Sequence, residues 1–525
     1  MKKRSLFIYL LVLVASVCMV ACGTPTTDKE STSGENPGVQ QDAGASEQVE
    51  EKKEEPKATP DAGESQTPEK ETEPLPESQP EPHPEVQPEK QPPLPPPAKT
   101  LVYYYVVVRG KLKGGADKAK LVHNQIVKAG KDAAMKLGDM SHHVYLNTKD
   151  TNEFLAIDVW DSKEGLDKYF KDPNVQKAFG QLFEGQPKIG VWKRRPGWRQ
   201  YWENDVSGKP HLRVMVEATL KEGEEAAKKR HNQIVTGALS AKPSVRELGD
   251  LVHYVYQNPK SPKAFLAFDV WNNPKGLDAY FKNPEVGKSF GQLFSAPPNI
   301  SVWKKAEGWT AYDTTLYTVT VVGKLKGDPN DAKKIHNEIV GKFSGVARGM
   351  GDLSHHVFTD PKDPTAFLAI DVWKDAAGMN KYLQDPNVQK ELGRLFTAPP
   401  SISVSIHRQG WKQYGENDVS GKAHLRVMVQ GKLKEAEEAA KKFHNQIVAG
   451  ALSAKPSVRD LGDLVHEVYT NPKEAKDFLA FDVWNDPKGL DGYFKDPNVQ
   501  KAFGQLFSAP PKLTVWKKAE GWTAY

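Results

Sequence analysis

Internal repetition constrains the fold of this chain more than any other feature. The phrase Asp-Val-Trp occurs four times, ending at Trp160, Trp271, Trp373 and Trp484. A His-Asn pair also occurs four times, beginning at His123, His231, His336 and His444. The interval from the first to the third member is identical in the two series. The 525-residue chain is therefore expected to contain four domains of about 105 residues, arranged as two copies of a larger block.

The pattern within one repeat predicts the order of its elements. Strands are predicted for four apolar, β-rich runs, at residues 103–112, 142–146, 154–160 and 188–193. Helices are predicted for residues 116–136 and for residues 165–183, where Asp172-Pro173 interrupts the helix. The order β-α-β-β-α-β is the ferredoxin-like split βαβ, so the expected fold class is α+β with four ferredoxin-like βαββαβ repeats. These repeats are expected to span residues 100–204, 209–312, 314–417 and 422–525.

The two faces of the predicted strand at 154–160 differ in composition. One face carries Leu155, Ile157 and Val159, and the other carries Phe154, Ala156, Asp158 and Trp160. We expect the aliphatic face to meet the helices and the mixed face to meet a second sheet, which tandem duplication supplies within the chain. Two intramolecular α+β barrels follow, formed by repeats one and two and by repeats three and four. Pairing across the two blocks is the alternative.

The N-terminal segment, 1–22, resembles a bacterial lipoprotein signal. Three basic residues precede an apolar run from Leu6 to Val17, and Met19-Val20-Ala21-Cys22 follows. The apolar run is too short for a comfortable transmembrane helix. We therefore expect residues 1–21 to be a signal peptide and Cys22 to be acylated, which attaches the chain to a lipid bilayer. Gly23 after this cysteine favours the outer membrane, so the expected location is the bacterial cell envelope.

Residues 22–99 are expected to form a disordered tether. They are rich in Pro, Glu, Gln, Ser and Thr and almost lack large apolar side chains, so they cannot bury enough surface to offset chain entropy. Residues 23–99 carry a net charge of −11, which leaves +13 for the repeats once the three cations of the signal are counted. This basic body predicts an anionic envelope polymer as a partner, whereas no nucleic-acid-binding motif occurs. Because Cys18 and Cys22 are the only cysteines, a disulfide scaffold and a cysteine zinc site are excluded.

The third predicted strand and the helix after it resemble a known family. The residues that carry the resemblance are Phe154-Leu-Ala-Ile-Asp-Val-Trp160, Gly165-Leu166, Tyr169, Pro173 and Phe179. They resemble the antibiotic-biosynthesis-monooxygenase-like (ABM) domains of the dimeric α+β barrel superfamily, and the resemblance extends over all four repeats. That family includes cofactor-independent oxygenases of aromatic polyketides, heme-degrading monooxygenases and members without known activity. The resemblance implies two sheets closed face to face and, as one function, a monooxygenase-like activity.

The resemblance also implies a pocket in each repeat. Heme-degrading members place a pocket tryptophan at the positions of Trp160, Trp271, Trp373 and Trp484. They often carry a helical histidine at the positions of Tyr169, Tyr280, Tyr382 and Tyr493. Because that histidine is absent, we expect neither heme nor any other cofactor. These eight aromatic residues are candidate pocket residues for a flat apolar ligand, and the alternative is that they fill the barrel.

A histidine and an aspartate are expected to face each other across the predicted hairpin. Their spacing is the same in every repeat, in the pairs His142 and Asp158, His253 and Asp269, His355 and Asp371, and His466 and Asp482. If the seven-residue loop is symmetric, Leu146 lies opposite Phe154 and His142 lies opposite Asp158. A carboxylate raises the basicity of an imidazole, so these pairs are candidate catalytic residues, with His142 as a general base. The alternative is a pair that only satisfies buried polar groups.

The helical histidine of each His-Asn pair is expected to be a core residue. His123 has Ile126 and Val127 three and four positions later, on the apolar side of the predicted helix. Together with His142 and Asp158 it would give two histidines and a carboxylate. We expect no metal site, because the predicted strand faces place the sheet between His123 and Asp158.

These observations leave three functions. The first is an envelope lipoprotein whose tandem barrels bind a ligand, either a small aromatic or apolar molecule or an anionic polymer. The second is a cofactor-independent, monooxygenase-like enzyme on an aromatic substrate, with His142 as base and Trp160 and Tyr169 lining the pocket. The third is a non-catalytic structural or docking module. The chain is expected to be a monomer in which the repeats pair internally.

Overall fold

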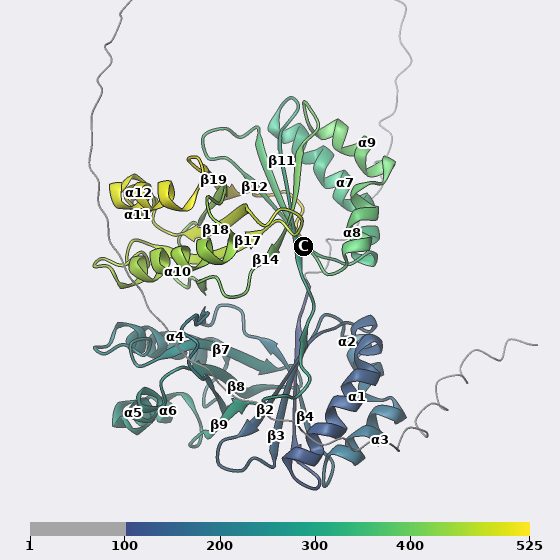
Figure 1. The fold of residues 1–525 in the computed structure, drawn as a ribbon, viewed down its shortest axis with the longest axis vertical. Helices are drawn as coiled ribbons and strands as arrows, with labels where there is room; N and C mark the ends of the chain where they lie inside the picture. The colour runs from purple at the N-terminus through teal and green to yellow at the C-terminus, as the bar shows by residue number, and fades with distance from the viewer. Residues whose placement is uncertain (1–100) are drawn as a thin grey trace, which may run out of the picture. The chain divides into compact units, whose positions relative to one another are not determined.

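The computed structural model describes residues 101–525 (Figure 1). The predicted signal peptide, Cys22 and the predicted tether lie outside the described residues. The described part is a mixed α+β structure with twelve helices and nineteen strands. None of the helices between residues 101 and 525 is both long enough and apolar enough to span a membrane.

The order β-α-β-β-α-α-β occurs four times, and in the first three repeats a short strand follows it. Repeat one comprises β1 (Tyr104–Lys111), α1 (Ala116–Lys136), β2 (Asp139–Asn147), β3 (Glu153–Trp160), α2 (Lys163–Phe170), α3 (Pro173–Leu182), β4 (Lys188–Arg194) and β5 (Tyr201–Glu203). Repeat two comprises β6 (Leu212–Thr219), α4 (Glu224–Ser240), β7 (Asp250–Asn258), β8 (Ser261–Trp271), α5 (Pro274–Lys282), α6 (Pro284–Leu293), β9 (Asn299–Lys305) and β10 (Tyr312–Asp313). Repeat three comprises β11 (Tyr317–Lys324), α7 (Pro329–Gly349), β12 (Asp352–Thr359), β13 (Ala366–Trp373), α8 (Ala376–Leu383), α9 (Pro386–Leu395), β14 (Ser401–His407) and β15 (Tyr414–Glu416). Repeat four comprises β16 (Leu425–Lys432), α10 (Glu437–Ser453), β17 (Asp463–Thr470), β18 (Asp477–Trp484), α11 (Pro487–Lys495), α12 (Pro497–Leu506) and β19 (Lys512–Lys518).

Short-range chemistry places the helix boundaries. The second helical stretch is divided at Asp172-Pro173, as predicted, because the Asp172 side chain accepts a hydrogen bond from the backbone N–H of Asn174 and caps α3. The start of α2 is fixed by Gly165, where a Cβ would lie 1.6 Å from the carbonyl oxygen of Leu137. Only glycine allows α2 to approach the end of α1 this closely.

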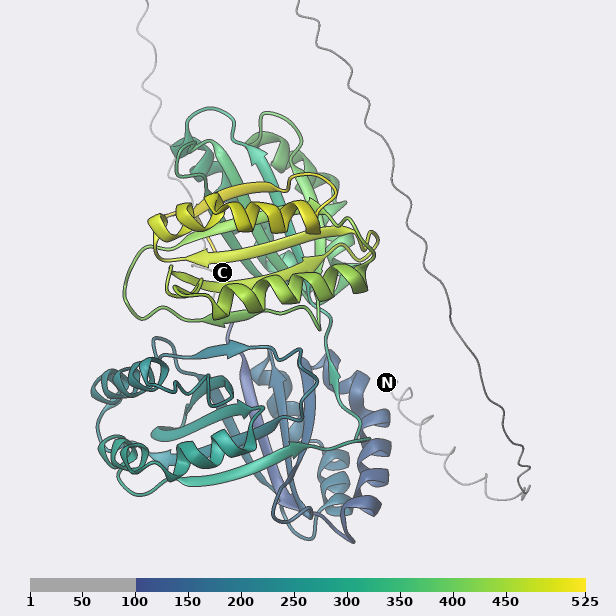
Figure 2. The same ribbon diagram turned by 60° about the vertical axis from the view of Figure 1, so that its left-hand side comes forward.

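The strands close into two rings. In the first, antiparallel pairs run in the order β1, β3, β2, β9, β6, β8, β7, β4 and back to β1. In the second, the order is β11, β13, β12, β19, β16, β18, β17, β14 and back to β11. Each ring is thus an eight-stranded barrel to which two repeats contribute four strands each. Helices α1, α2 and α3 cover one side of the first barrel and α4, α5 and α6 the other (Figure 1), and the yellow and yellow-green helices of repeat four lie across that repeat's strands (Figure 2).

The predicted orientation of the third strand is wrong. Phe154, Ala156 and Trp160 belong to the core between the sheet and helices α1, α2 and α3. Leu155 and Ile157 point the other way, into the barrel. The mixed face therefore meets the helices, and the aliphatic face meets the second sheet.

Aromatic packing explains this orientation. The helices present rings of their own, and the rings of Trp160 and Tyr169 lie 5.3 Å apart between their centroids. The barrel interior is filled instead by residues from both sheets, among them Leu155, Met215 and Phe268, all nearly inaccessible to solvent. Because side chains occupy the lumen, the candidate site has to be sought between the sheet and the helices.

Two short strands join the barrels. β5 pairs antiparallel with β15, so the end of repeat one lies against the end of repeat three. Glu203 accepts hydrogen bonds from Lys412 at 2.5 Å and from Arg459 at 2.9 Å. Glu416 in turn accepts hydrogen bonds from Arg199 and Arg246 of the first half. These partly buried charges specify which segments pair.

Candidate functional site

A chain of three hydrogen-bonded side chains lies under the helices of repeat one. His142 on β2 lies opposite Asp158 on β3, with its Nδ1 2.5 Å from Oδ1 of Asp158. The other ring nitrogen of His142, Nε2, is 3.0 Å from Nε2 of His123 on α1. His123 and Asp158 are buried, and the side chain of His142 is 13% exposed. The predicted hairpin register is confirmed, with Leu146 also opposite Phe154.

The same chain recurs in the other repeats. The imidazole-to-carboxylate distances are 2.6, 2.5 and 2.6 Å in the pairs His253 and Asp269, His355 and Asp371, and His466 and Asp482. The helical histidines, each 3.0 Å from the strand histidine, are His231, His336 and His444. The expectation that the sheet separates the helical histidine from the aspartate is therefore wrong. Within residues 101–525, no group of three His, Cys, Asp or Glu side chains is arranged to hold a metal ion.

An asparagine fixes the protonation of the helical histidine. The Asn124 amide is oriented by the backbone of the paired repeat, since its Nδ2 donates to the carbonyl of Gly308 at 2.9 Å and its Oδ1 accepts from the N–H of Thr310 at 2.7 Å. Oδ1 also lies 3.2 Å from Nδ1 of His123, so His123 carries a proton on Nδ1. Burial, together with nearby His142, lowers the pKa of His123 to about 3. His123 is thus neutral, and its Nε2 is an acceptor.

The strand histidine must then donate on both sides. Nε2 of His142 donates to His123, and one proton lies between Nδ1 of His142 and the carboxylate of Asp158. In repeat three, burial opposes the charged imidazole, but the Asp371 carboxylate raises the pKa of His355 overall. Neither nitrogen of His142 is free to accept a proton from a ligand while this chain is intact.

A tyrosine from the paired repeat completes each site. Tyr312, at the end of repeat two, donates its hydroxyl to Oδ2 of Asp139 in repeat one at 2.5 Å. Its strand, β10, pairs with β2 so that Tyr312 lies opposite His142. Trp309 packs on His123 with ring centroids 4.9 Å apart. The site of one repeat is therefore incomplete without the repeat that pairs with it.

The other three sites are completed in the same way. Tyr201, Tyr414 and Tyr525 donate to Asp250, Asp463 and Asp352 at 2.7, 2.7 and 2.5 Å. The tryptophans that precede these tyrosines and lie against the helical histidines are Trp198, Trp411 and Trp522. Sequence reasoning missed these residues, although the phrase Trp-x-x-Tyr recurs near the end of each repeat and could have revealed them.

A small cavity adjoins the hydrogen-bonded chain in every repeat. Its volume is about 70, 60, 80 and 60 Å³ in repeats one to four. In repeat one it is lined by Asp139, His142, Asp158, Trp160 and Tyr169, among others. The predicted pocket residues that line the other cavities are Trp271, Tyr280, Trp373, Tyr382 and Tyr493. The remaining one, Trp484, packs on Tyr493 with centroids 5.5 Å apart.

One equivalent pair of buried polar atoms, a tryptophan Nε1 and an aspartate Oδ1, has no hydrogen-bond partner among the described residues in any repeat. In repeat one they are Nε1 of Trp160 and Oδ1 of Asp139, which lie opposite each other on β3 and β2. These side chains are 1% and 5% exposed. The equivalent pairs are Trp271 and Asp250, Trp373 and Asp352, and Trp484 and Asp463. Burial, and then the charge of Asp158, raise the pKa of Asp139 to about 8, so this carboxyl holds a proton near neutral pH.

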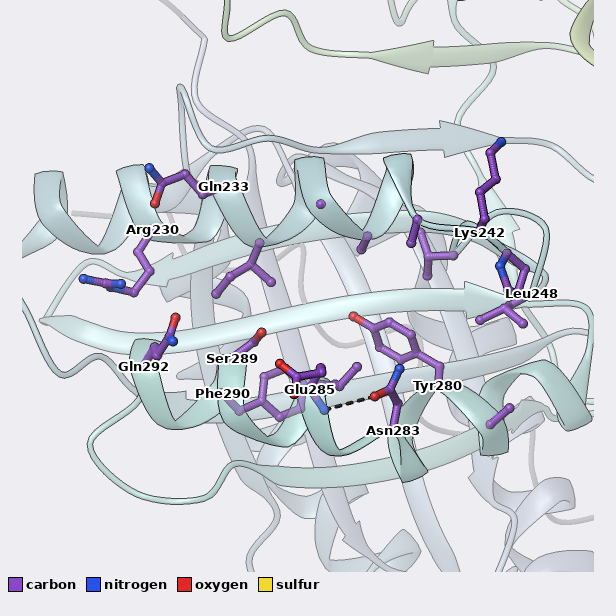
Figure 3. A pocket seen from close by; sticks show the side chains of 18 residues that line it. Arg230, Gln233, Lys242, Leu248, Tyr280, Asn283, Glu285, Ser289, Phe290 and Gln292 are labelled. Atoms are coloured by element: carbon purple, nitrogen blue, oxygen red, sulfur yellow. Dashed lines mark hydrogen bonds between the residues drawn. The ribbon is translucent and has the colours of Figure 1, made fainter. Parts of the chain in front are cut away.

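Repeat two adds an open cleft beside its cavity. The cleft has a volume of about 610 Å³ and lies between α4 and the pair α5 and α6 (Figure 3). Tyr280 and Phe290 line both the cleft and the cavity, as do Ile234, Ala238 and Val245. A largely apolar cleft of this size is typical of small-molecule sites.

Comparison with known proteins gives partial similarities. No family model matches the chain. An uncharacterized protein of Synechocystis sp. is 29% identical to this chain over 85 residues. These residues are 16% of this chain and 58% of the length of that relative. An anthrone oxidase-like protein is similar in structure over 41% of this chain and 95% of that chain, with 13% identity and a TM-score of 0.30. A monooxygenase-like protein from Listeria innocua is similar over 39% and 94%, with 10% identity and a TM-score of 0.24. A chlorite dismutase from Candidatus Nitrospira defluvii is similar over 38% and 91%, with 12% identity and a TM-score of 0.27.

Proposed function

We propose that this chain is an envelope lipoprotein whose tandem ABM-like barrels bind a small, largely apolar molecule between sheet and helices. The observation that carries the proposal is the pair of buried, unpaired polar atoms in each repeat, the indole Nε1 and the aspartate Oδ1, both of which belong to the cavity lining in repeats one to three. A buried donor without an acceptor costs about 1–3 kcal/mol. Because the Asp139 carboxyl is kept protonated by burial, it donates as well, and both groups favour a ligand carbonyl or hydroxyl oxygen.

The cavity walls favour a small aromatic or apolar ligand over a polymer. In repeat one the walls include Phe154, Trp160, Tyr169 and Phe179, which suit an apolar body. A space of about 70 Å³ excludes an anionic polymer, and it takes up an aromatic molecule only when the side chains that line it move apart. Such a polymer remains a prediction for the outer surface of the basic repeats.

Acylation of Cys22 would place these barrels at a membrane. The sequence Met19-Val20-Ala21-Cys22 after an apolar run supports this part of the proposal. Residues 22–99 would then act as the tether, and the outer membrane is the proposed location. The bilayer is a partner through the acyl chains alone.

A cofactor-independent, monooxygenase-like enzyme on an aromatic substrate is the second candidate. The unpaired Oδ1 of Asp139 in the cavity lining favours it, because oxygenation without a cofactor first requires removal of a phenolic or enolic proton. With both nitrogens of His142 engaged, the atom open to a substrate proton is Oδ1 of Asp139. Because this carboxyl keeps its own proton below about pH 8, it can act as the base only in its ionised form, so such an activity should rise as the pH approaches 8.

Native mass spectrometry with an absorbance spectrum, on the full chain purified from its native host, tests the binding proposal. We expect a co-purifying mass in the small-molecule range. The control changes Trp160, Trp271, Trp373 and Trp484 to Phe, which keeps the apolar walls but removes the four indole N–H donors, and should release that mass. A wild-type chain that carries no bound mass and no chromophore would contradict the proposal.

A further inference from the structure

One helix position distinguishes repeat two from the other repeats. The residue before the helical histidine is Val122, Ile335 or Phe443 in repeats one, three and four, but it is Arg230 in repeat two. Ile335 and Phe443 pack against the cores of their repeats. Arg230 instead lines an open cleft beside α4.

This cleft lies between α4 and α6. Figure 3 shows Arg230 and Lys242 at opposite ends of the cleft, with Tyr280 and Phe290 between them. The apolar side chains in the middle of the cleft form a continuous contact surface. The two cationic residues lie at the ends of that surface. A ligand in this cleft would touch the same Tyr280 that lines the inner cavity.

The positive charge at one end of the cleft is poorly neutralised. Nε of Arg230 is buried without a hydrogen-bond partner among residues 101–525, and the Glu222 carboxylate lies 3.9 Å from it. The acidic residue within the cleft, Glu285, is 3.5 Å from Lys288 on its own helix. Arg230 is therefore available to an anionic group, and a guanidinium pairs with such groups in two parallel hydrogen bonds.

We propose that the cleft of repeat two binds one amphipathic organic anion, with its apolar body between α4 and α6 and its carboxylate or equivalent group on Arg230. This inference rests on the proposed function. It adds the class of the ligand and the repeat through which a small molecule enters the space between the sheet and the helices. The cleft supplies both features that such a molecule requires, about 610 Å³ of largely apolar space and a cation at its edge.

Two fluorescent probes with nearly the same apolar body test the proposal. 8-Anilinonaphthalene-1-sulfonate carries an anionic group, and N-phenyl-1-naphthylamine lacks it. The protein is the full chain with Cys22→Ser, which prevents acylation. Detergent is then not needed to keep acyl chains in solution, so the probes cannot partition into detergent micelles. We expect one sulfonate probe to bind per chain. Arg230→Gln, which removes the charge and keeps a polar side chain, should weaken its binding about 10-fold or more, since a hydrogen bond to a charged group contributes that much. Binding of the neutral probe should change less than about twofold.

A variant copied from repeat four provides the matched control. Arg230→Phe introduces the residue that repeat four has at this position, so it should close the cleft and abolish binding of both probes, while unchanged thermal unfolding shows that the barrel is intact. Sulfonate binding that is insensitive to both Arg230 variants overturns the inference. If neither probe binds but the native chain still carries a small molecule, the inference fails and the proposed function stands. If both tests are negative, both proposals fail.

Discussion

The hydroxyl of Tyr525 offers the sharpest test that one repeat completes the site of another. It donates to Oδ2 of Asp352 at 2.5 Å, and Tyr525 is only 7% exposed. Tyr525→Phe removes that donor and nothing else. The carboxyl of Asp352 already has one unpaired oxygen, so the variant leaves both side-chain oxygens without a side-chain partner.

The expected cost follows from this burial. An unsatisfied buried acceptor costs about 1–3 kcal/mol, which corresponds to about 5- to 150-fold in an opening equilibrium. Residues 519–525, here called the tail, are joined to β12 at Tyr525 by two backbone hydrogen bonds. One runs from the N–H of His355 to the carbonyl of Tyr525 at 2.9 Å, and the other from the N–H of Tyr525 to the carbonyl of His355 at 3.0 Å. Hydrogen exchange of these two amides therefore reports the opening directly.

A double-mutant cycle separates the contact from general damage. In an Asp352→Val background the acceptor is gone, so adding Tyr525→Phe should cost less than about 0.5 kcal/mol. Tyr312→Phe, the same change in the site of repeat one, should leave both amides unaffected. Protection that falls less than about twofold in Tyr525→Phe, or an equal loss in both backgrounds, would refute the reasoning.

Three further changes probe the same architecture. Asn337→Ala removes hydrogen bonds to the carbonyl of Gly521 at 3.0 Å and from the N–H of Thr523 at 2.7 Å, so exchange at Thr523 should rise as the free energy of tail opening falls by about 1–3 kcal/mol. Burial, and then the charge of Asp371, raise the pKa of Asp352 from 3.8 to about 7, so the folded state binds this proton more tightly than the unfolded state. Stability should accordingly fall as the pH rises from about 4 to about 7, and Asp352→Asn should flatten that fall in urea midpoints measured against pH. Gly378→Ala would place a Cβ 1.9 Å from the carbonyl oxygen of Met350 and should lower the melting temperature, whereas Gly393→Ala, which meets nothing within 4 Å in helix α9, should leave it unchanged or raise it.

The hairpin could be predicted because its information is local. Residues 147–153 are a polar loop, and a symmetric loop fixes which residues oppose each other, so His142 was expected opposite Asp158. Helix α1 coincides with the predicted residues 116–136, and the break at Pro173 follows from backbone chemistry. These features depend on residues close together in the chain.

The direction of the strand faces could not be derived in this way. An aliphatic face and an aromatic face are both apolar, and hydrophobicity alone does not decide which one meets helices. Which face meets the helices depends on the side chains that each face contacts. Trp160 packs on Tyr169 of α2, and Leu155 packs with Met215 and Phe268 of the next repeat. Trp309 and Tyr312 were missed for the same reason, since the side chains that they contact belong to the preceding repeat.

The exchange of tails between repeats sets the smallest unit that can be inherited. Repeat one on its own would lack Trp309 and Tyr312, which pack on its histidines. Its own Trp198 and Tyr201 would have no second repeat to pack against. Duplication of one repeat would therefore yield a defective protein, whereas duplication of a pair preserves every site. The period shared by the Asp-Val-Trp and His-Asn series is the length of that pair. Adding or removing an even number of repeats would leave every site complete. Adding or removing an odd number would leave one repeat without the tryptophan and tyrosine that complete its site.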